Sequence, residues 1–554
     1  MSARLFGGAL LVALVFAPPA AAGVTKQTFR VPVSAPDEHG AKVALDTDVY
    51  MPAGRAPPAG RPFVVVFHGG GSNKDSGFDA GHAKAFAEHG YVSLLYSQRG
   101  HGSSSGQTAV AGPKEMRDVF DVIHWALARP AFHVDRMRIG LTGYSQGGLH
   151  TNLAQVWASD RRYNPYGIRF RALEPADTPD RVFEALDTHD VVKLSFGVAL
   201  LETYLVGTHA QTAPVVGKWI GVVAADQPQL LAGDVCQDDV HDTSTSSIKA
   251  DLAFRSVGCH DSRMKPPIMW AQAFDDTLFT ADMAISMYER MPSRDKRLYL
   301  DMAGHAAPAA SDAELASKLR DQIAFMDHAL RGRRLRSPRV VWWTRDGAVA
   351  VPGGAYKYPD AAWFRQSAKR WPPPGTRNRV FTLGSGSTPL VPLAEDERND
   401  PVALAAFSAS PMGTSVLPGS LPATDLPGAV AAYRSEPFAA GTELAGSPVA
   451  SLAWTPAGPD TQLVVKLYDQ APDGGLQLIT RGVQGMRGAP AGQPLRVEVR
   501  DQAFSWLLRP GHRLLAWVMA GDAGFYKPYA GQAGGLLDLA ASTLSVPLRP
   551  RPTR

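Results

Sequence analysis

The chain is poor in cysteine, in net charge and in long apolar runs. It has 2 cysteines among 554 residues, too few for a zinc site built on thiolates. Acidic and basic residues nearly balance at a net charge of +4 and are interspersed, so the sequence offers no basic face for nucleic acid. Beyond the N-terminus, no stretch is long and apolar enough to cross a bilayer. The function must therefore be inferred from local motifs.

The first 22 residues have the features of a secretory signal peptide. Arg4 precedes an apolar core at 5–16, and three alanines end the segment as the small residues of a cleavage site. We expect cleavage before Gly23 and a mature protein that is secreted or periplasmic. In an oxidising compartment, Cys236 and Cys259 are expected to form one disulfide bridge, the alternative being two separate buried thiols.

A Gly-x-Ser-x-Gly motif at 143–147 is the most informative stretch of the chain. A buried-strand run at 138–142 precedes it, and Leu149 and Leu153 follow it at helical spacing. A strand, a sharp turn and a helix are the context in which this motif mounts a nucleophilic serine, and its glycines leave room for the strained turn. We predict Ser145 as the nucleophile, the alternative being a serine in an ordinary glycine-rich turn.

An acid and a histidine follow downstream in the order that an α/β-hydrolase requires, each after a predicted strand. The strand at 267–271 leads to Asp275 and Asp276, and the strand at 297–300 leads to His305. A neutral imidazole would accept the serine proton during attack, while a carboxylate would orient the ring and stabilise the imidazolium. We prefer Asp276 as the acid because the Thr-Leu-Phe-Thr stretch that follows it resembles the stretch after the acid in this fold, and Asp275 remains the alternative.

A glycine-rich segment at 68–71 follows a strand-like run at 63–67. In lipase- and esterase-like hydrolases such a loop contributes one backbone N–H to the oxyanion hole, and the residue after the nucleophile contributes the other. We assign these donors to Gly70, or a residue next to it, and to Gln146. Each donor aimed at the developing oxyanion contributes about 2.7–4 kcal/mol to transition-state stabilisation.

Predicted strands and helices alternate around these motifs, as is typical of a parallel sheet. A strand at 92–96 precedes a loop with Arg99 and His101, and a helix with one apolar face spans 116–127. The Arg99 and His101 loop is interpreted as structural, because no second ligand lies at a metal-binding interval. These elements predict an α/β-hydrolase sheet.

The chain is too long for a single core, so several domains are expected. We predict a catalytic domain over 23–336, into which residues 159–263 are inserted as a lid that selects substrates. Short β-rich runs then follow, beginning at 340–344, and residues 463–469 alternate as a half-buried strand does. An all-β domain of the sandwich or jelly-roll type is predicted over 337–554.

Three segments of this β-rich region, at 433–437, 465–474 and 509–514, resemble the non-catalytic jelly-roll domain of a known family. Together with the serine turn, the acid and the histidine, they make nearly all of the mature chain similar to the Xaa-Pro dipeptidyl-peptidase and cocaine-esterase family of serine hydrolases. The resemblance implies hydrolysis of esters, of amides or of dipeptides ending in proline. It also implies that no metal or organic cofactor takes part.

Two features differ from the pattern of that family. Its members often carry an aromatic residue after the nucleophile and use a tyrosine hydroxyl near the first loop as an oxyanion donor, whereas this chain has Gln146 and a glycine-rich loop. The local chemistry is that of a general esterase, with Xaa-Pro dipeptidyl-peptidase activity as the alternative. No acidic pair for a substrate's amino group is identified in the sequence; Glu184, Asp187 and Asp190 of the lid are available for it, the alternative being solvated surface acids.

We therefore expect a secreted or periplasmic serine hydrolase that acts on a small ester or a short peptide. Neither a nucleic-acid partner nor a membrane span is expected, and the sequence leaves the oligomeric state open. A hypothesis of another class makes the β-rich domain a carbohydrate- or surface-binding module on a catalytically silent hydrolase fold. The competent residue at every catalytic position favours the enzyme.

Overall fold

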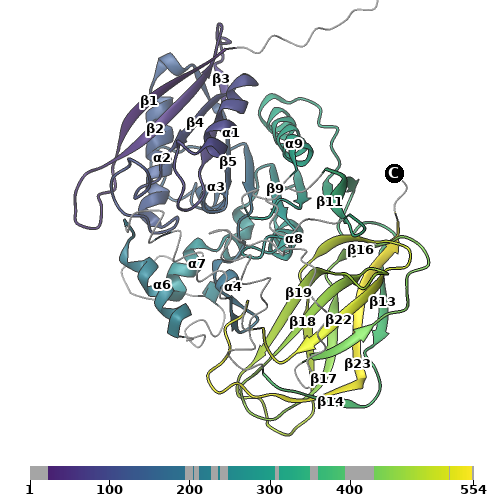
Figure 1. The fold of residues 1–554 in the computed structure, drawn as a ribbon. Helices are drawn as coiled ribbons and strands as arrows, with labels where there is room; N and C mark the ends of the chain where they lie inside the picture. Colours follow the sequence, from purple (N-terminus) through teal and green to yellow (C-terminus); the bar gives the residue numbers. More distant parts are fainter. Residues whose placement is uncertain are drawn as a thin grey trace, which may run out of the picture.

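The computed structural model describes residues 23–193, 204, 211–225, 235–237, 248–305, 311–349, 360–392, 430–522 and 525–551. They form an α/β lobe, purple to teal in Figure 1, and a β-rich lobe, green to yellow. The predicted signal peptide at 1–22 lies outside this part of the chain. None of the helices in the described segments combines the length and apolarity needed to cross a membrane.

The α/β lobe is built on a mixed sheet with a parallel centre. In spatial order its strands are β1 (Val24–Val33), β2 (Val43–Pro52), β4 (Val92–Tyr96), β3 (Arg61–Phe67), β5 (Val134–Tyr144), β6 (Ala172–Ala176), β9 (Ile268–Ala273), β10 (Lys296–Asp301) and β11 (Val340–Asp346). The β1–β2 and β2–β4 pairs are antiparallel, and the pairs from β4 to β11 are parallel. This topology confirms the α/β-hydrolase prediction.

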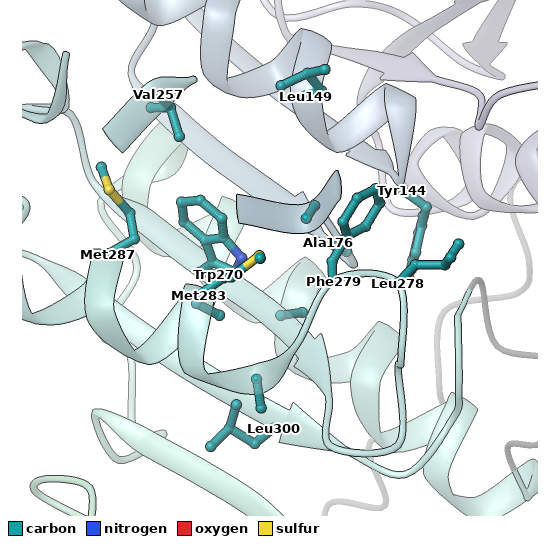
Figure 2. Close-up of a cluster of buried hydrophobic side chains, with 14 of the residues drawn as sticks. Tyr144, Leu149, Ala176, Val257, Trp270, Leu278, Phe279, Met283, Met287 and Leu300 are labelled. Atoms are coloured by element: carbon teal, nitrogen blue, oxygen red, sulfur yellow. The ribbon is translucent and has the colours of Figure 1, made fainter. Parts of the chain in front are cut away.

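Helices cover both faces of this sheet. They are α1 (Gly77–Glu88), α2 (Pro113–Leu127), α3 (Gln146–Val156), α8 (Ala281–Arg290) and α9 (Asp312–Arg331). Alternate residues of β3 point to opposite faces, so Val64 and Val66 pack with α1 and α9, while Phe63 shares a cluster with α2, α3 and α8. Figure 2 shows part of the cluster that contains Phe63, with Trp270 of β9 beside Met283 of α8.

The predicted lid at 159–263 begins too early, because residues 172–176 form β6, a central strand between β5 and β9. The part that follows β6 is described only in part. Its helices and strands are α4 (Val182–Leu186), β7 (Asp187–Thr188), β8 (Val191–Val192), α6 (Pro214–Ala225) and α7 (Ile248–Arg255). The lid also has short 3-10 helices at Val235–Gln237, Val257–Cys259 and Asp261–Arg263, and two more lie outside it at Pro130–Phe132 and Asp360–Ala362. Cys236 and Cys259 form the expected disulfide bridge, which joins two of these turns. Arg255 ties α7 to the α/β lobe, since its guanidinium donates to the carbonyl oxygens of Ala109 and Val110.

The β-rich lobe consists of a larger and a smaller group of strands. Its elements are β12 (Trp363–Ala368), β13 (Arg377–Thr382), β14 (Ser387–Leu390), β15 (Val430–Arg434), β16 (Thr442–Gly446), β17 (Val449–Pro456), β18 (Thr461–Gln470), β19 (Leu476–Met486), β20 (Leu495–Arg500), β21 (Phe504–Leu508), β22 (Arg513–Met519) and β23 (Gly535–Pro550). The long strand β23 pairs with β13, β14, β16 and β17. A separate sheet has the order β15–β22–β18–β19.

Strand β18 is buried on both faces, so the prediction of a half-buried strand at 463–469 is wrong. It lies between β22 and β19 within its sheet. Leu463 and Val465 point into the main core, whereas Val464 and Tyr468 pack in a second cluster with Val191 of β8. The second face is covered by residues that are distant in sequence, which alternation within the strand does not reveal.

The predicted boundary between residues 336 and 337 does not separate two sheets. Strand β11 follows this boundary and pairs in parallel with β10. At its far end, Arg345 and Asp346 pair with Trp506 and Leu507 of β21. The α/β sheet therefore continues by hydrogen bonds into the β-rich lobe, and β11 belongs to both.

Candidate active site

Ser145 occupies the sharp turn between β5 and α3. Its backbone has φ 55° and ψ −121°, a strained conformation for a residue with a side chain, and its N–H donates to the carbonyl oxygen of Ala176 at 2.9 Å. The flanking glycines are required by close packing. A Cβ at Gly143 would lie 2.6 Å from the carbonyl carbon of Gly147, and one at Gly147 would overlap the carbonyl oxygen of Phe67. This geometry mounts the Ser145 hydroxyl at the carboxyl end of the central strand.

The structure brings the three predicted catalytic side chains together. His305 Nε2 lies 2.9 Å from Ser145 Oγ, and His305 Nδ1 lies 2.9 Å from Asp276 Oδ2. These residues follow β5, β9 and β10, parallel strands whose carboxyl ends meet at one edge of the sheet. A proton can therefore pass from the hydroxyl to the ring while the carboxylate holds the opposite nitrogen protonated.

Asp276 is fully buried and held from several directions. Its Oδ1 accepts the N–H groups of Leu278 and Phe279 at 2.9 and 3.1 Å, and its Oδ2 accepts the Gln272 side chain at 2.9 Å. Asp275, the alternative acid, points elsewhere, since its Oδ1 accepts the Gly304 N–H at 2.8 Å. Of the two carboxylates, Asp276 is the one that contacts the imidazole.

The pKa of His305 reflects opposing influences. Burial of the ring acts to lower it, but the negative charge of Asp276 and the hydrogen bond to it outweigh burial and raise the pKa above its ordinary value of 6.5. Phe279 packs edge-on against the ring at 5.3 Å between centroids, beside Leu278. The imidazole is therefore a stronger base than a free histidine, in a setting that excludes most water.

The segment that carries His305 is held by acidic side chains in a role that the sequence analysis missed. Three consecutive backbone N–H groups donate to three different acids: Met302 to Glu314, Ala303 to Asp301 and Gly304 to Asp275. All three acids are buried. In the sequence, short acidic side chains at the carboxyl ends of β9 and β10 indicate polar groups near the site. Only the fold shows that they accept hydrogen bonds from the backbone of residues 303 and 304.

Lys318 of α9 neutralises part of this acidic group. Its Nζ lies 2.7 Å from Asp301 Oδ2 and 3.7 Å from Asp177 Oδ2. Burial acts to lower the pKa of Lys318, but the two carboxylates raise it well above its ordinary value. Burial also raises the pKa of Asp177 to about 7. One buried cation thus shares its charge with two acids, one directly after β6 and one at the end of β10.

The predicted oxyanion donors belong to the residue after Ser145 and to the glycine-rich loop. Gln146 begins α3, so its backbone N–H is among those that have no partner within a helix. In the glycine-rich loop, Gly69 lies against the nucleophile: a Cβ placed on it would be 3.7 Å from Ser145 Cβ. The assignment of Gly70 and Gln146 as donors stays a prediction.

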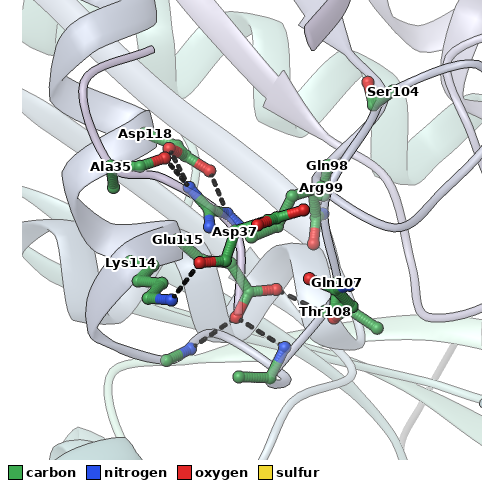
Figure 3. Close-up of polar contacts among 12 residues, drawn as sticks. Ala35, Asp37, Gln98, Arg99, Ser104, Gln107, Thr108, Lys114, Glu115 and Asp118 are labelled. Atoms are coloured by element: carbon green, nitrogen blue, oxygen red, sulfur yellow. Dashed lines mark hydrogen bonds and ion pairs between the residues drawn. The ribbon is translucent and has the colours of Figure 1, made fainter. Parts of the chain in front are cut away.

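The loop with Arg99 and His101 is tied into the fold (Figure 3). Arg99 forms a bidentate pair with Asp118 of α2 at 2.6 and 2.7 Å, and both groups are buried. Glu115 of the same helix accepts N–H groups at its N-terminus, including that of Gly112 at 2.7 Å. These contacts agree with a structural role. In the described segments, no group of three or more His, Cys, Asp or Glu is arranged to hold a metal ion.

The β-rich lobe reaches the segment that carries the acid. Asp282, at the start of α8, accepts the Ser447 hydroxyl at 2.6 Å and the Ala503 N–H at 2.7 Å. Phe274, directly after β9, contacts the ring of Phe504 at 5.7 Å between centroids. The lobe therefore packs against the turn that presents Asp276.

This sheet, the serine turn and the β-rich lobe define a serine hydrolase of the α/β-hydrolase class. The chain matches the family model described as X-Pro dipeptidyl-peptidase (S15 family) over residues 39–161. It also matches the model described as X-Pro dipeptidyl-peptidase C-terminal non-catalytic domain over residues 334–534. The chain belongs to the Xaa-Pro dipeptidyl-peptidase and cocaine-esterase-like family of serine hydrolases.

Solved structures share the architecture of both lobes. An aminopeptidase from the marine sediment archaeon Thaumarchaeota archaeon has a TM-score of 0.64 at 13% identity, covering 98% of this chain and 97% of that one. An α-amino acid ester hydrolase has a TM-score of 0.62 at 17% identity, covering 98% of this chain and 100% of that one. A CocE/NonD family hydrolase from Staphylococcus aureus has a TM-score of 0.62 at 13% identity, covering 96% of this chain and 97% of that one. At these identities the likeness establishes the fold alone.

A shorter match exists in Escherichia coli. An uncharacterized 31.7 kDa protein of that organism is 37% identical over 81 residues, which are 14% of this chain. The chain covers 27% of the length of this curated relative. The match therefore adds no information about activity or substrate.

Proposed function

We propose that this protein is an exported serine hydrolase that cleaves a carboxylic ester or an amide through an acyl-enzyme. The observation that carries the proposal is the continuous hydrogen-bonded path from Ser145 Oγ through His305 to Asp276, with 2.9 Å at each step. The strained backbone of Ser145 adds to it, because such strain is maintained at functional sites.

In the first half-reaction, Ser145 Oγ attacks the substrate carbonyl carbon as His305 Nε2 takes the hydroxyl proton. The carbonyl oxygen becomes an oxyanion, which the N–H groups of Gly70 and Gln146 would stabilise. Collapse of this intermediate expels an alcohol or amine, which receives the proton from His305. In the second half-reaction, water attacks the acyl-enzyme by the same route and releases the acid and the free serine.

For the substrate we favour a small-molecule carboxylic ester. Leu278 and Phe279, the side chains that follow Asp276, are apolar and pack beside the site, so this wall offers no charge for an ionic group. Of the lid acids that could bind an amino group, Glu184 pairs with Arg181 at 2.7 Å. Xaa-Pro dipeptidyl-peptidase activity is the second candidate, since the model described as X-Pro dipeptidyl-peptidase (S15 family) matches the segment that includes Ser145.

The test is the Ser145→Ala variant assayed with a fluorophosphonate probe, a p-nitrophenyl acyl ester and an Ala-Pro anilide. We expect loss of labelling and turnover with nearly unchanged thermal unfolding, and faster hydrolysis of the ester than of the anilide by the unmodified enzyme. Ser159→Ala, at an exposed serine, is the matched control and should label normally. Retained labelling of Ser145→Ala would refute the nucleophile, and a faster anilide reaction would favour the peptidase.

Export and the competing class of function are tested separately. A mature N-terminus at Gly23 in the periplasm or medium would support export, and an intact Met1 on the accumulated protein would contradict it. If the β-rich lobe were the working part, an intact protein with the Ser145→Ala change would still bind polysaccharide tightly. The whole chain is the proper sample, because β11 is shared between the lobes.

A further inference from the structure

Three buried side chains and one backbone carbonyl group, from distant segments, form one hydrogen-bonded chain beside Ser145. The Tyr204 hydroxyl lies 2.6 Å from Gln146 Oε1, and Gln146 Nε2 lies 2.6 Å from Gln98 Oε1. Gln98 Nε2 lies 2.8 Å from the carbonyl oxygen of His68. The four residues come from the lid, from α3, from the loop after β4 and from the loop after β3. We call this arrangement the Tyr204–His68 chain.

The direction of every bond in the Tyr204–His68 chain is determined from one end. The carbonyl oxygen of His68 can only accept, so Gln98 must present its NH₂ there and its oxygen to Gln146. Gln146 must then donate through its NH₂ to Gln98 and turn its own oxygen toward Tyr204. The Tyr204 hydroxyl is therefore the donor. A flip of Gln98 would break the bonds on both of its sides, and a flip of Gln146 would set its oxygen against the oxygen of Gln98.

The same logic determines the tautomer of His68. Its Nε2 accepts the backbone N–H of Gln98 at 2.8 Å, so in the neutral ring the proton resides on Nδ1. That Nδ1–H donates to the carbonyl oxygen of Gly69 at 2.7 Å. Burial and the neighbouring His101 lower the pKa of His68 well below its ordinary value, so the ring stays neutral at working pH.

This contact orients the peptide unit that contains the predicted oxyanion donor. The Gly69 carbonyl and the Gly70 N–H belong to one planar trans peptide and point in opposite directions. By binding the Gly69 oxygen, His68 turns the Gly70 N–H the other way. Because 69–71 are all glycine, the segment has no side chains to fix its conformation, and hydrogen bonds must do so.

We infer that the Tyr204–His68 chain sets the spacing of the two oxyanion donors and makes it depend on the lid. One end holds the Gly70 peptide through His68, and the middle holds Gln146, whose backbone N–H is the other donor. Tyr204 supplies the contact from the lid. The inference rests on the proposed hydrolase function and assigns His68, Gln98 and Tyr204 as positioning residues for it.

The first test is Tyr204→Phe, which removes only the donating hydroxyl. We expect kcat to fall about tenfold, less than the 10²–10³ that follows outright loss of one oxyanion donor, with KM changed by less than about twofold. The affinity for a tetrahedral boronic acid inhibitor should fall by the same factor as kcat. Tyr91→Phe is the matched control, because Tyr91 is a buried tyrosine that donates at 2.6 Å to Asp327 on α9. It should lose comparable stability and keep kcat.

The second test is a double-mutant cycle with Gln146→Met, which keeps the backbone donor and removes the side-chain link. If the hydroxyl acts through Gln146, the double variant should be no slower than Gln146→Met alone. Unchanged kcat in Tyr204→Phe, a loss confined to KM, or multiplied effects in the double variant would each overturn the inference. Rates are expressed per site titrated with fluorophosphonate. An unmodified enzyme that neither labels nor hydrolyses would instead refute the proposed function.

Discussion

Lys193 Nζ lies 3.0 Å from the carbonyl oxygen of Leu278, in the turn that follows Asp276, and a second donation at 3.1 Å reaches Thr277. The ammonium group is buried, and burial lowers its pKa to about 8. Its backbone forms a β-bridge with Tyr526 of the β-rich lobe. A single lysine thus connects that lobe to the turn that presents the acid.

Lys193→Met is therefore expected to reduce both stability and kcat. Two buried carbonyl oxygens would lose a donor, at about 1–3 kcal/mol for each group left unsatisfied, and the Asp276 turn would loosen. Chemical unfolding and steady-state kinetics measure the two effects. Lys466→Met is the matched control, because Lys466 is buried within the β-rich lobe and pairs with Asp522 at 3.0 Å. It should lose stability but keep kcat; equal kcat in both variants would contradict the connection.

Asp276→Asn should lower kcat by about 10⁴ while the protein stays folded, because an amide cannot stabilise the imidazolium or select its tautomer. The charge of Asp276 also raises the pKa of His305, so the rise of kcat/KM with pH should occur at lower pH in the variant. A pH profile of residual ester hydrolysis checks this shift. An unmoved profile, or a larger loss in Asp275→Asn, would show that Asp276 is not the acid.

Asp275→Asn should change the pH dependence of stability. Burial raises the pKa of Asp275 from 3.8 to about 8. Since the folded-state value exceeds the unfolded one, its stabilising contribution is full below the lower value and is lost as the pH rises to the higher one, by at most about 1.4 kcal/mol per pH unit. The variant lacks this loss and should gain stability relative to the unmodified protein across that range. Urea unfolding at several pH values measures the free energy of unfolding of both proteins. A difference between them that does not change with pH would contradict the prediction.

Replacing both Cys236 and Cys259 by serine should lower the free energy of unfolding by about 3 kcal/mol, because the bridge joins residues 23 apart and restricts the unfolded chain. Thiol titration of the unfolded, non-reduced protein should find no free cysteine, and reduction should release both thiols. Unfolding midpoints within error of each other, or free thiols before reduction, would argue against a stabilising bridge.

Much of the site could be predicted because it is encoded locally. The Gly-x-Ser-x-Gly motif between a strand and a helix requires a tight turn, and parallel strands bring their carboxyl ends to one edge. Ser145, Asp276 and His305 could therefore be proposed from order alone. The choice between Asp275 and Asp276 rested on a resemblance. Both residues follow the same strand, and what distinguishes them is the direction in which each side chain points.

Other features depend on contacts between residues far apart in sequence. The burial of both faces of β18, the pairing of β11 with β10 and the acids behind His305 all come from segments that the fold brings together. The Tyr204–His68 chain is of the same kind, since glutamine, tyrosine and histidine at its positions have no mutual spacing that a motif could show.

The amino-acid sequence by itself determined the alternation of strands and helices, the strained serine turn and the order of the predicted catalytic side chains, because hydrophobic periodicity and glycine act over a few neighbouring residues. Only the tertiary structure decided which carboxylate contacts the imidazole, how the glycine-rich loop is held and how the β-rich lobe supports the acid. Those outcomes depend on the direction of single side chains and on hydrogen bonds across tens to hundreds of residues, which no local pattern records.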